Sequence, residues 1–458
     1  MTKMKRYFSG EAGISELLRV SLPMIVSQAS SSLMLFTDRY LLAPLGKEYP
    51  PASMAGGFSS VLLSIFFMGL LGYINPLVSQ YLGAGKKHYG VRVLSQGILV
   101  VLCVFPVILL AGRFGIEPYF DWADIADDQK ILALQYFSIV NFGNVFMLSN
   151  TVLSSFFTGT GHSRLVMICN VFGLLLNIPL NLYLIANGIG GQYSGIEGAA
   201  LATLLSYSAM TCLYLFFLLR PKIRREHEIR RFSLIPDKEV LSKLLTYGGP
   251  TGSEFFLLFF AFNTFVTLFH SYGADEALAM TIAFNWDIVA LLPLWGLNIG
   301  IMSMVGKFMG AGKVDQAVEA TMSGARIAMV LSALTMISFL FFTEPMVRMF
   351  LPELSSDTLP EVTSLAMTML RMIAFYCLAT AVNMVLTATL RAAGDTKWCM
   401  YISLSANWSM LIFAWASIKV LHWSPETTWY IFVGTVVIES FVFLARYLSG
   451  QWKQIRVI

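Results

Sequence analysis

The chain alternates long apolar segments with short polar breaks. A membrane-spanning α-helix needs about 20 consecutive, mostly apolar residues, and twelve segments meet that requirement. They lie near residues 17–44, 54–80, 92–112, 131–157, 165–187, 196–219, 243–270, 277–304, 322–343, 362–389, 398–420 and 428–448. Glycine-containing turns such as Gly83–Gly85 and Gly159–Gly161 fall in the breaks. The pattern predicts an all-α integral membrane protein with twelve transmembrane helices.

One polar stretch is much longer than the other breaks. It runs from residue 220 to residue 242 and leaves six predicted spans on either side. We therefore expect an N-terminal six-helix bundle over 1–219, a linker over 220–242 and a C-terminal six-helix bundle over 243–458.

The two halves repeat one another. Gly83-Ala84-Gly85-Lys86 reappears as Gly310-Ala311-Gly312-Lys313, and the same shift along the chain carries Pro23 onto Pro250 without a gap. A second echo, at a slightly longer shift, carries Gly161 onto Gly394. An apolar chain made of two similar halves is typical of membrane transporters, whose substrate path runs through a central cleft between the repeats. Since each half has an even number of spans, the repeats should run parallel.

The basic residues predict which ends of the spans face the cytoplasm. The N-terminus with Lys3, Lys5 and Arg6, every second break after it, the linker and the C-terminus hold most of the lysine and arginine. The opposite breaks are acidic: Asp121, Asp124, Asp127 and Asp128; Asp275 and Glu276; Glu353 and Asp357. Because cytoplasmic loops carry the basic excess, we expect cytoplasmic termini and a cytoplasmic linker in a multi-pass protein of the cell (inner) membrane.

Composition narrows the class of function. Hydrophobic residues make up 56% of the 458 residues and charged residues 13%, with a mean hydropathy of +0.68, which disfavours a soluble domain. The net charge of +4 gives no indication of nucleic-acid binding. The N-terminus lacks the pattern of a cleaved signal peptide, so the first span should remain in the mature chain.

Motifs for chemistry are missing from the sequence. The five cysteines lie in apolar segments at no metal-ligand spacing and are expected to pack as small apolar residues. No phosphate-binding G-x-x-x-x-G-K-[ST] loop, nucleophile elbow or zinc-protease motif is present. We therefore expect neither an enzyme nor a cofactor, and no direct use of ATP.

Acidic residues inside the spans are the strongest candidates for a functional site. A carboxylate in hydrocarbon costs several kcal/mol unless it is hydrated, paired or protonated, yet Asp38, Glu254 and Asp287 all lie in apolar segments. Each suits the binding of a proton, a sodium ion or a cationic substrate. Asp38 precedes Arg39, which leaves a position near the membrane surface as an alternative, whereas Glu254 has no basic neighbour in the sequence. Glu439 is a weaker fourth candidate, with a structural hydrogen bond as its alternative role.

The acids are not duplicated by the repeat. The shift that carries Pro23 onto Pro250 also places Ser27 opposite Glu254 and Ser60 opposite Asp287, while Asp38 is matched by Phe265. This predicts two unlike polar pockets, one in each half.

Polar partners for Asp38 are found in the fifth and sixth spans. Asn177 and Asn181 are one helical turn apart and share a face, and Pro179 between them weakens the backbone bonding of that helix. Thr203 in the sixth span offers a hydroxyl group. One carboxylate with amide and hydroxyl oxygens suits a hard monovalent cation or a proton relay. Hydrogen bonds between neutral side chains of neighbouring helices are the alternative.

The chain resembles the multidrug and toxic compound extrusion (MATE) family over nearly its whole length. The resemblance rests on the two six-span halves and on an ordered set of motifs. These are Gln80-Tyr81-Leu82-Gly83-Ala84-Gly85, Leu175-Leu176-Asn177-Ile178-Pro179-Leu180-Asn181, Lys307-Phe308-Met309-Gly310-Ala311-Gly312 and Leu390-Arg391-Ala392-Ala393-Gly394-Asp395, together with Pro23 and Pro250. It implies efflux of cationic and amphipathic small molecules, driven by inward flow of sodium ions or protons through alternating access.

The resemblance also implies roles for individual residues. Asp38 matches the family's acid in the first span, and Asn177, Asn181 and Thr203 match its polar partners, which makes these four a candidate sodium site. Glu254 and Tyr376 match positions of the NorM-type branch, to which this chain looks closer.

One position departs from that branch: Thr380 stands where NorM-type members carry an aspartate in the tenth span. We hypothesise that Asp287 in the eighth span supplies the missing carboxylate. The cation-coupling candidates are Asp38, Asn177, Asn181, Thr203, Glu254 and Asp287, and the substrate-binding candidates are Asp38, Glu254, Tyr376 and Asp287.

Other functions remain open at this stage. A dedicated exporter of one natural product has the same architecture, and a flippase of lipid-linked sugars shares such repeats, although the acidic charges inside the spans favour a cationic or neutral substrate. The sequence predicts neither the identity of the substrate nor the choice between sodium ions and protons. We expect a monomer embedded in membrane lipid.

Overall fold

The protein is helical, as the sequence predicts. A computed structural model describes residues 10–122, 127–227, 234–350 and 359–458. Twelve helices in these ranges are long and apolar enough to cross a membrane, one for each predicted span. Lys3, Lys5, Arg6, Asp124, Glu353 and Asp357, used above for orientation, lie outside the described residues.

Most helices extend beyond their predicted bounds. The eighth span is predicted over 277–304, whereas the helix α12 covers Ala274–Gly310. Polar residues at helix ends lower the local hydropathy without interrupting the backbone hydrogen bonds, so an apolar count trims them. The same effect places Arg391 in the last turn of α15 (Leu359–Ala393) rather than in a loop after it.

Packing divides the chain into two compact units, Leu22–Ser253 and Glu254–Val457, the second of which includes the N-terminal segment that ends at Ser21. The helices before the division at Ser253 are α2 (Ile14–Leu42), η1 (Ala43–Leu45), α3 (Tyr49–Gly72), α4 (Ile74–Gly83), α5 (Lys87–Trp122), α6 (Asp127–Gly159), α7 (Ser163–Asn187), α8 (Ile196–Leu219), α9 (Pro221–Glu226), α10 (Lys238–Lys243) and η2 (Leu244–Gly248). Those after it are α11 (Gly249–His270, which begins just before the division), α12, α13 (Val314–Phe341), α14 (Thr343–Arg348), α15, α16 (Thr396–Lys419), α17 (Pro425–Leu448) and η3 (Gln451–Gln454).

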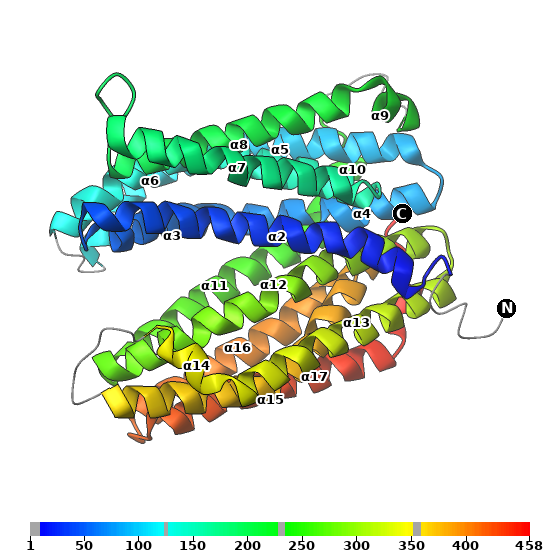
Figure 1. Ribbon diagram of the computed structural model, residues 1–458. Helices are drawn as coiled ribbons and strands as arrows, with labels where there is room; N and C mark the ends of the chain where they lie inside the picture. The colour runs from blue at the N-terminus through cyan, green and yellow to red at the C-terminus, as the bar shows by residue number, and fades with distance from the viewer. Residues whose placement is uncertain (1–9, 123–126, 228–233, 351–358) are drawn as a thin grey trace. The chain divides into compact units, whose positions relative to one another are not determined.

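Small residues bring helices of the first unit into close contact. α3 packs against α6, and both α6 and α7 pack against α8 (Figure 1). A Cβ atom added to Gly198 at the start of α8 would lie 2.2 Å from the carbonyl oxygen of Leu184 in α7, so only glycine permits this approach. Such close backbone contact at small residues is a general feature of helix packing in membranes. It allows polar side chains of α7 and α8 to meet.

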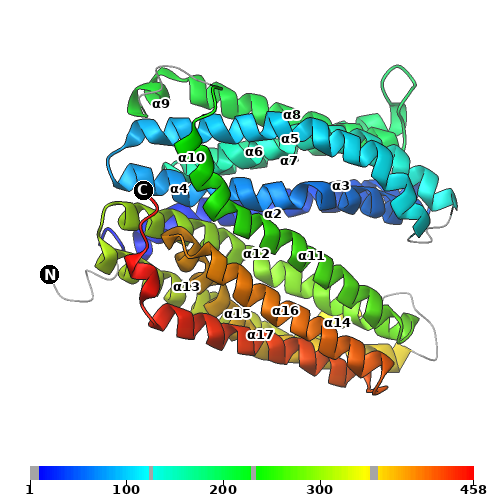
Figure 2. The ribbon, with the colours of Figure 1, turned by 180° about the vertical axis from the view of Figure 1, so that it is seen from behind.

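α15 is the central helix of the second unit. It packs against α12, α13 and α17 (Figure 2) and contributes to two separate buried clusters. Its buried residues from Met369 to Cys377 lie in a cluster with Trp429, whereas those from Ala381 to Ala393 lie in a cluster with Cys399. One helix thus connects two apolar regions at different levels.

The linker is fastened to α5 where its second half begins. The side chain of Gln96 donates a hydrogen bond to the carbonyl oxygen of Ile235 (3.0 Å) and accepts one from the backbone N–H of Asp237 (3.1 Å). Arg92 lies 3.4 Å from the Asp237 carboxylate. The linker backbone is therefore held by one amide side chain that satisfies both an acceptor and a donor.

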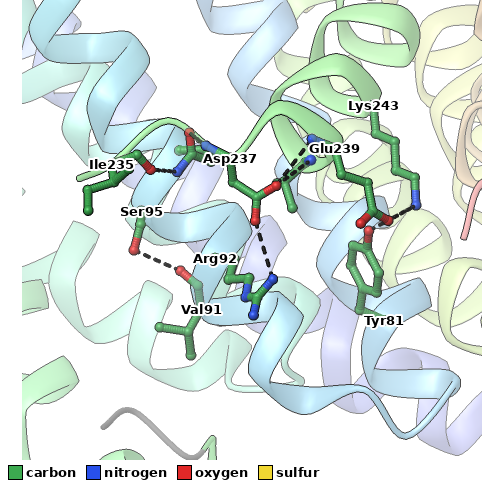
Figure 3. Close-up of polar contacts among 10 residues, drawn as sticks. Tyr81, Val91, Arg92, Ser95, Ile235, Asp237, Glu239 and Lys243 are labelled. Atoms are coloured by element: carbon green, nitrogen blue, oxygen red, sulfur yellow. Dashed lines mark hydrogen bonds and ion pairs between the residues drawn. The ribbon is translucent and has the colours of Figure 1, made fainter. Parts of the chain in front are cut away.

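The short helix α10 then leads into the seventh span. The Asp237 carboxylate accepts hydrogen bonds from the N–H groups of Glu239 (3.1 Å) and Val240 (3.3 Å), which caps the helix. At its other end the Lys243 ammonium donates to Glu239 (2.9 Å) and to the hydroxyl of Tyr81 in α4 (3.2 Å) (Figure 3). The first unit thus holds this part of the linker at α4 and at α5.

We predict that Gln96→Ala loosens the linker. It removes two partly buried hydrogen bonds worth about 1 kcal/mol each, which corresponds to a tenfold or greater rise in local opening. Limited trypsin digestion at the basic residues of the linker should accelerate accordingly. Arg92→Ala is the matched control, because its exposed ion pair contributes under about 1 kcal/mol. Equal digestion rates in the two variants would contradict the prediction.

Candidate ion and substrate sites

Asp38 lies in a buried polar cluster of the first unit. Its side chain is only 2% exposed, although the next residue in α2 is Arg39. The Asn181 amide donates to Oδ1 (2.6 Å), and the Thr203 hydroxyl donates to Oδ2 (2.6 Å). Both carboxylate oxygens thus accept hydrogen bonds from neutral side chains. The geometry thus brings α2, α7 and α8 together at this acid, while its role in ion coupling stays a prediction.

The two asparagines of α7 are joined to one another. The Asn181 amide also donates to the side-chain oxygen of Asn177 (2.9 Å) and to its carbonyl oxygen (3.1 Å), one turn earlier. Asn177 also interacts with the Asp38 carboxylate through its side chain, and the Asn181 Oδ1 atom is buried without a hydrogen-bond partner. A buried amide oxygen without a partner, next to the Asp38 carboxylate, is chemically suited to bind a cation or a water molecule that carries a proton.

Glu254 has a basic partner, contrary to the sequence interpretation. Arg391 donates to its Oε1 atom at 2.8 Å, and the two side chains are 11% and 1% exposed, Arg391 first. The guanidinium also lies over the ring of Phe255, 5.4 Å from its centroid. The two charges compensate one another, so Glu254 is not a free carboxylate. The sequence does not reveal this pair, because the partners are far apart along the chain and the apolar pattern ends the tenth span before Arg391.

Glu439 lies near that ion pair. Its carboxylate is hydrogen-bonded with Ser403 of α16 and interacts electrostatically with Glu254 and Arg391. This arrangement matches the structural hydrogen bond that the sequence left open as the alternative for Glu439.

Asp287 forms a second buried polar site. It is hydrogen-bonded with the phenol of Tyr376 in α15. Thr380 follows one turn later on α15, and its hydroxyl is buried without a hydrogen-bond partner. Tyr376 thus connects Asp287 to the turn of α15 before Thr380, and the hypothesis that Asp287 supplies the carboxylate missing at Thr380 stays a prediction.

Aromatic rings surround the Asp287 region, which sequence reasoning did not predict. The ring of Phe432 contacts Tyr376 edge to face at 5.8 Å. Trp429 lies 5.2 Å from Phe432 and 5.0 Å from Phe284, which is one turn before Asp287. A carboxylate among aromatic faces is a chemically suitable environment for an organic cation. The aromatic residues of α17 were visible in the sequence but had no pattern that separated them from lipid-facing ones.

Glu254 and Asp287 do not share a site. Their respective partners on α15, Arg391 and Tyr376, are about four helical turns apart on one continuous helix. At 1.5 Å per residue this separation is about 22 Å along the axis. The second unit thus has two acidic sites at different levels, of which one is charge-compensated.

Comparison with known proteins identifies the family. The MatE family model matches residues 23–183 and again residues 250–416, more than half of the chain. The chain belongs to the MATE family, whose members are membrane transporters and not enzymes. The starts of the two matches differ by the shift that carries Pro23 onto Pro250, and their ends by the shift that carries Gly161 onto Gly394.

Relatives cover most of the chain. It is 25% identical over 395 residues to the multidrug resistance protein MdtK of Yersinia pseudotuberculosis, covering 86% of this chain and 84% of the relative. It is equally similar, with the same coverage, to the probable multidrug resistance protein NorM of Neisseria meningitidis, over 403 residues.

Solved structures share the fold. A MOP superfamily transporter from Pyrococcus furiosus aligns with a TM-score of 0.85 at 19% identity, covering 100% of this chain and 98% of that one. A multidrug resistance MATE family transporter in an outward-facing conformation aligns with a TM-score of 0.84 at 20% identity, covering 96% and 97%.

We predict strong coupling between Glu254 and Arg391. Arg391→Met leaves a buried carboxylate uncompensated and should lower the free energy of unfolding by about 3–5 kcal/mol. Glu254→Gln with Arg391→Met should lower it much less, because neither charge remains. Denaturant unfolding of the detergent-solubilised protein, arranged as a double-mutant cycle, measures the coupling. Strictly additive effects would show that the pair does not interact.

Proposed function

We propose that this MATE transporter is a secondary active exporter of cationic or amphipathic small molecules. It exchanges them for inward-moving protons or sodium ions by alternating access, with Asp38 as the coupling acid. The observation that supports this most directly is the bonding of Asp38, a buried carboxylate whose two oxygens accept hydrogen bonds from the neutral side chains of Asn181 and Thr203. Such an acid can gain or lose a cation without breaking an ion pair.

The kind of substrate follows from the relatives and from the second unit. MdtK and NorM are described as multidrug resistance proteins, and an exporter of this class suits the acids and aromatic rings found here. We assign substrate contact to Asp287 and Tyr376 with the neighbouring aromatic rings. Glu254, which pairs with Arg391, has a structural role in this assignment.

Coupling requires that the ion and the substrate disfavour one another. A proton or sodium ion bound at Asp38 removes a negative charge that would otherwise stabilise a bound cation nearby. By linkage, the substrate then lowers the affinity for the ion by the same factor. The ion gradient can drive export only through this reciprocal effect.

The setting of the protein is part of the proposal. A multi-pass protein with most lysine and arginine at the termini, in alternate breaks and in the linker should lie in the cell (inner) membrane with its termini in the cytoplasm. We expect it to act as a monomer, since each chain carries both repeats.

We predict that Asp38→Asn abolishes gradient-driven transport. Inverted vesicles containing the protein should accumulate a fluorescent cationic dye under either a sodium gradient or a proton gradient, whichever the wild type uses. Asparagine keeps the shape of the side chain but neither binds a proton nor carries a charge. The uptake rate should fall at least tenfold.

Asp128→Asn, at an exposed acid near the start of α6, is the control and should transport normally. Wild-type rates in Asp38→Asn would rule out Asp38 as the coupling acid. Well-folded wild-type protein that moves no dye under either gradient would instead favour a dedicated exporter or a lipid-linked substrate.

A second transport prediction concerns Asp287. Asp287→Asn should weaken the binding of the cationic dye at equilibrium, measured by fluorescence anisotropy in detergent, at least fivefold. The exposed acid Asp275, in the first turn of the same helix, gives the matched control Asp275→Asn. Unchanged dye affinity in Asp287→Asn would remove Asp287 from the substrate site.

A further inference from the structure

A cluster of metal-ligating side chains lies outside both acidic sites. His162 in the turn between α6 and α7 faces the end of α9, where Glu226 and His227 follow one another. One ligand atom from each residue lies within 4.8 Å of the others, and His162 Nε2 is 3.6 Å from Glu226 Oε2. Two imidazoles and a carboxylate from separate segments thus converge on one point of the first unit.

The ring of His162 is held in one orientation. The hydroxyl of Thr160 donates to the carbonyl oxygens of Phe156 and Phe157 (3.0 and 3.1 Å), so its oxygen is left to accept from His162 Nδ1 at 3.3 Å. If Nδ1 carries the proton, Nε2 presents a lone pair toward the Glu226 carboxylate. A lone pair and a carboxylate oxygen repel unless a cation or a proton lies between them. Thr160 has the orienting position that partners of metal-bound histidines commonly occupy.

His227 supplies an independent observation. Its side chain is 3% exposed, and its Nε2 atom is buried without a hydrogen-bond partner. A buried imidazole nitrogen that no protein group satisfies is an available ligand atom next to His162 and Glu226.

We propose that His162, Glu226 and His227 form a zinc-binding site, with a water molecule as the fourth ligand. Two histidines and one carboxylate are a common ligand set for Zn²⁺. Zinc–ligand bonds of about 2.0–2.1 Å in a tetrahedron place the ligand atoms about 3.3 Å apart. The distance of 3.6 Å between His162 and Glu226 is close to that value, and since the three ligand atoms lie within 4.8 Å of one another, binding requires the side chains to draw closer together. The positive charge of the nearby Lys87 opposes the binding of a cation, and the negative charge of Glu226 offsets this repulsion.

Such a site would fix the first half of the linker. Glu226 and His227 lie just after the sixth span, and His162 belongs to the turn that joins α6 to α7. A bound ion would tie these two segments together, as Gln96 ties the second half of the linker to α5. Zinc would therefore change the stability of the linker without contributing a group to either transport site.

The test is equilibrium zinc binding to the full-length chain in detergent, after removal of metals with a chelator. Competition with a fluorescent zinc chelator gives the affinity, and elemental analysis gives the stoichiometry. We expect one Zn²⁺ per chain, with the affinity lowered at least tenfold by Glu226→Gln and by His162→Gln. His270→Ala, at an exposed histidine in α11, should bind as the wild type does. Substoichiometric binding to the wild type, or equal affinities in all variants, would overturn the proposal.

A second measurement separates metal binding from simple folding effects. Zinc should slow trypsin cleavage of the linker in the wild type, by a factor of 1 + [Zn²⁺]/Kd if cleavage requires release of the ion. It should leave cleavage of Glu226→Gln unchanged, and this variant is expected to fold because the side chain is half-exposed and keeps its shape. Equal protection of both proteins would overturn the proposal, whatever the effect of removing the buried His227.

Discussion

Inside a bilayer, a polar group that lacks a partner within the protein has no water to replace it. The backbone meets this constraint by forming helices, and the spans are helical for that reason. Polar side chains satisfy the same constraint by bonding to one another, and the acids of this protein have different kinds of partner. Asp38 is held by neutral donors from two other helices, whereas Glu254 is held by a guanidinium. The chemical behaviour of each acid follows from the kind of partner that holds its carboxylate.

The difference between these solutions is energetic. An acid held by an amide and a hydroxyl can lose its charge at modest cost, because both donors are neutral and can reorient or bind a cation instead. Removing the charge of an acid paired with a buried arginine leaves that arginine uncompensated, at a cost of several kcal/mol. The two acids therefore differ in what holds them: neutral donors from α7 and α8 hold Asp38, whereas the Arg391 guanidinium holds Glu254 and fastens α11 to the end of α15.

The sequence predicts those features of the structure that depend on a single segment or on one regular spacing within it. Each span could be predicted because its apolar run is local. The pairing of Asn177 with Asn181 could be predicted because both lie on one face of one helix, and the family resemblance supplied their link to Asp38. Contacts between distant helices carry no such signal. The apolar pattern ends the tenth span before Arg391. Only the full length of α15 shows that Arg391 lies on the helix and can reach Glu254. The rings near Asp287 and the cluster around His227 were missed for the same reason, because each combines residues that are separated in sequence and individually ordinary.

The two acidic sites of the second unit share one helix, and this limits how they can influence one another. Tyr376 and Arg391 are about 22 Å apart along α15, so each acid has its own partner at a different level of the same helix. A helix of this length is stiff along its axis, however, so a shift of α15 that alters the Asp287–Tyr376 bond must also act on the Glu254–Arg391 pair. That pair resists displacement because separating its charges in an apolar environment is costly. Any movement of α15 that keeps this ion pair intact must therefore carry the start of α11 with it, because Glu254 lies on α11 and Arg391 on the last turn of α15.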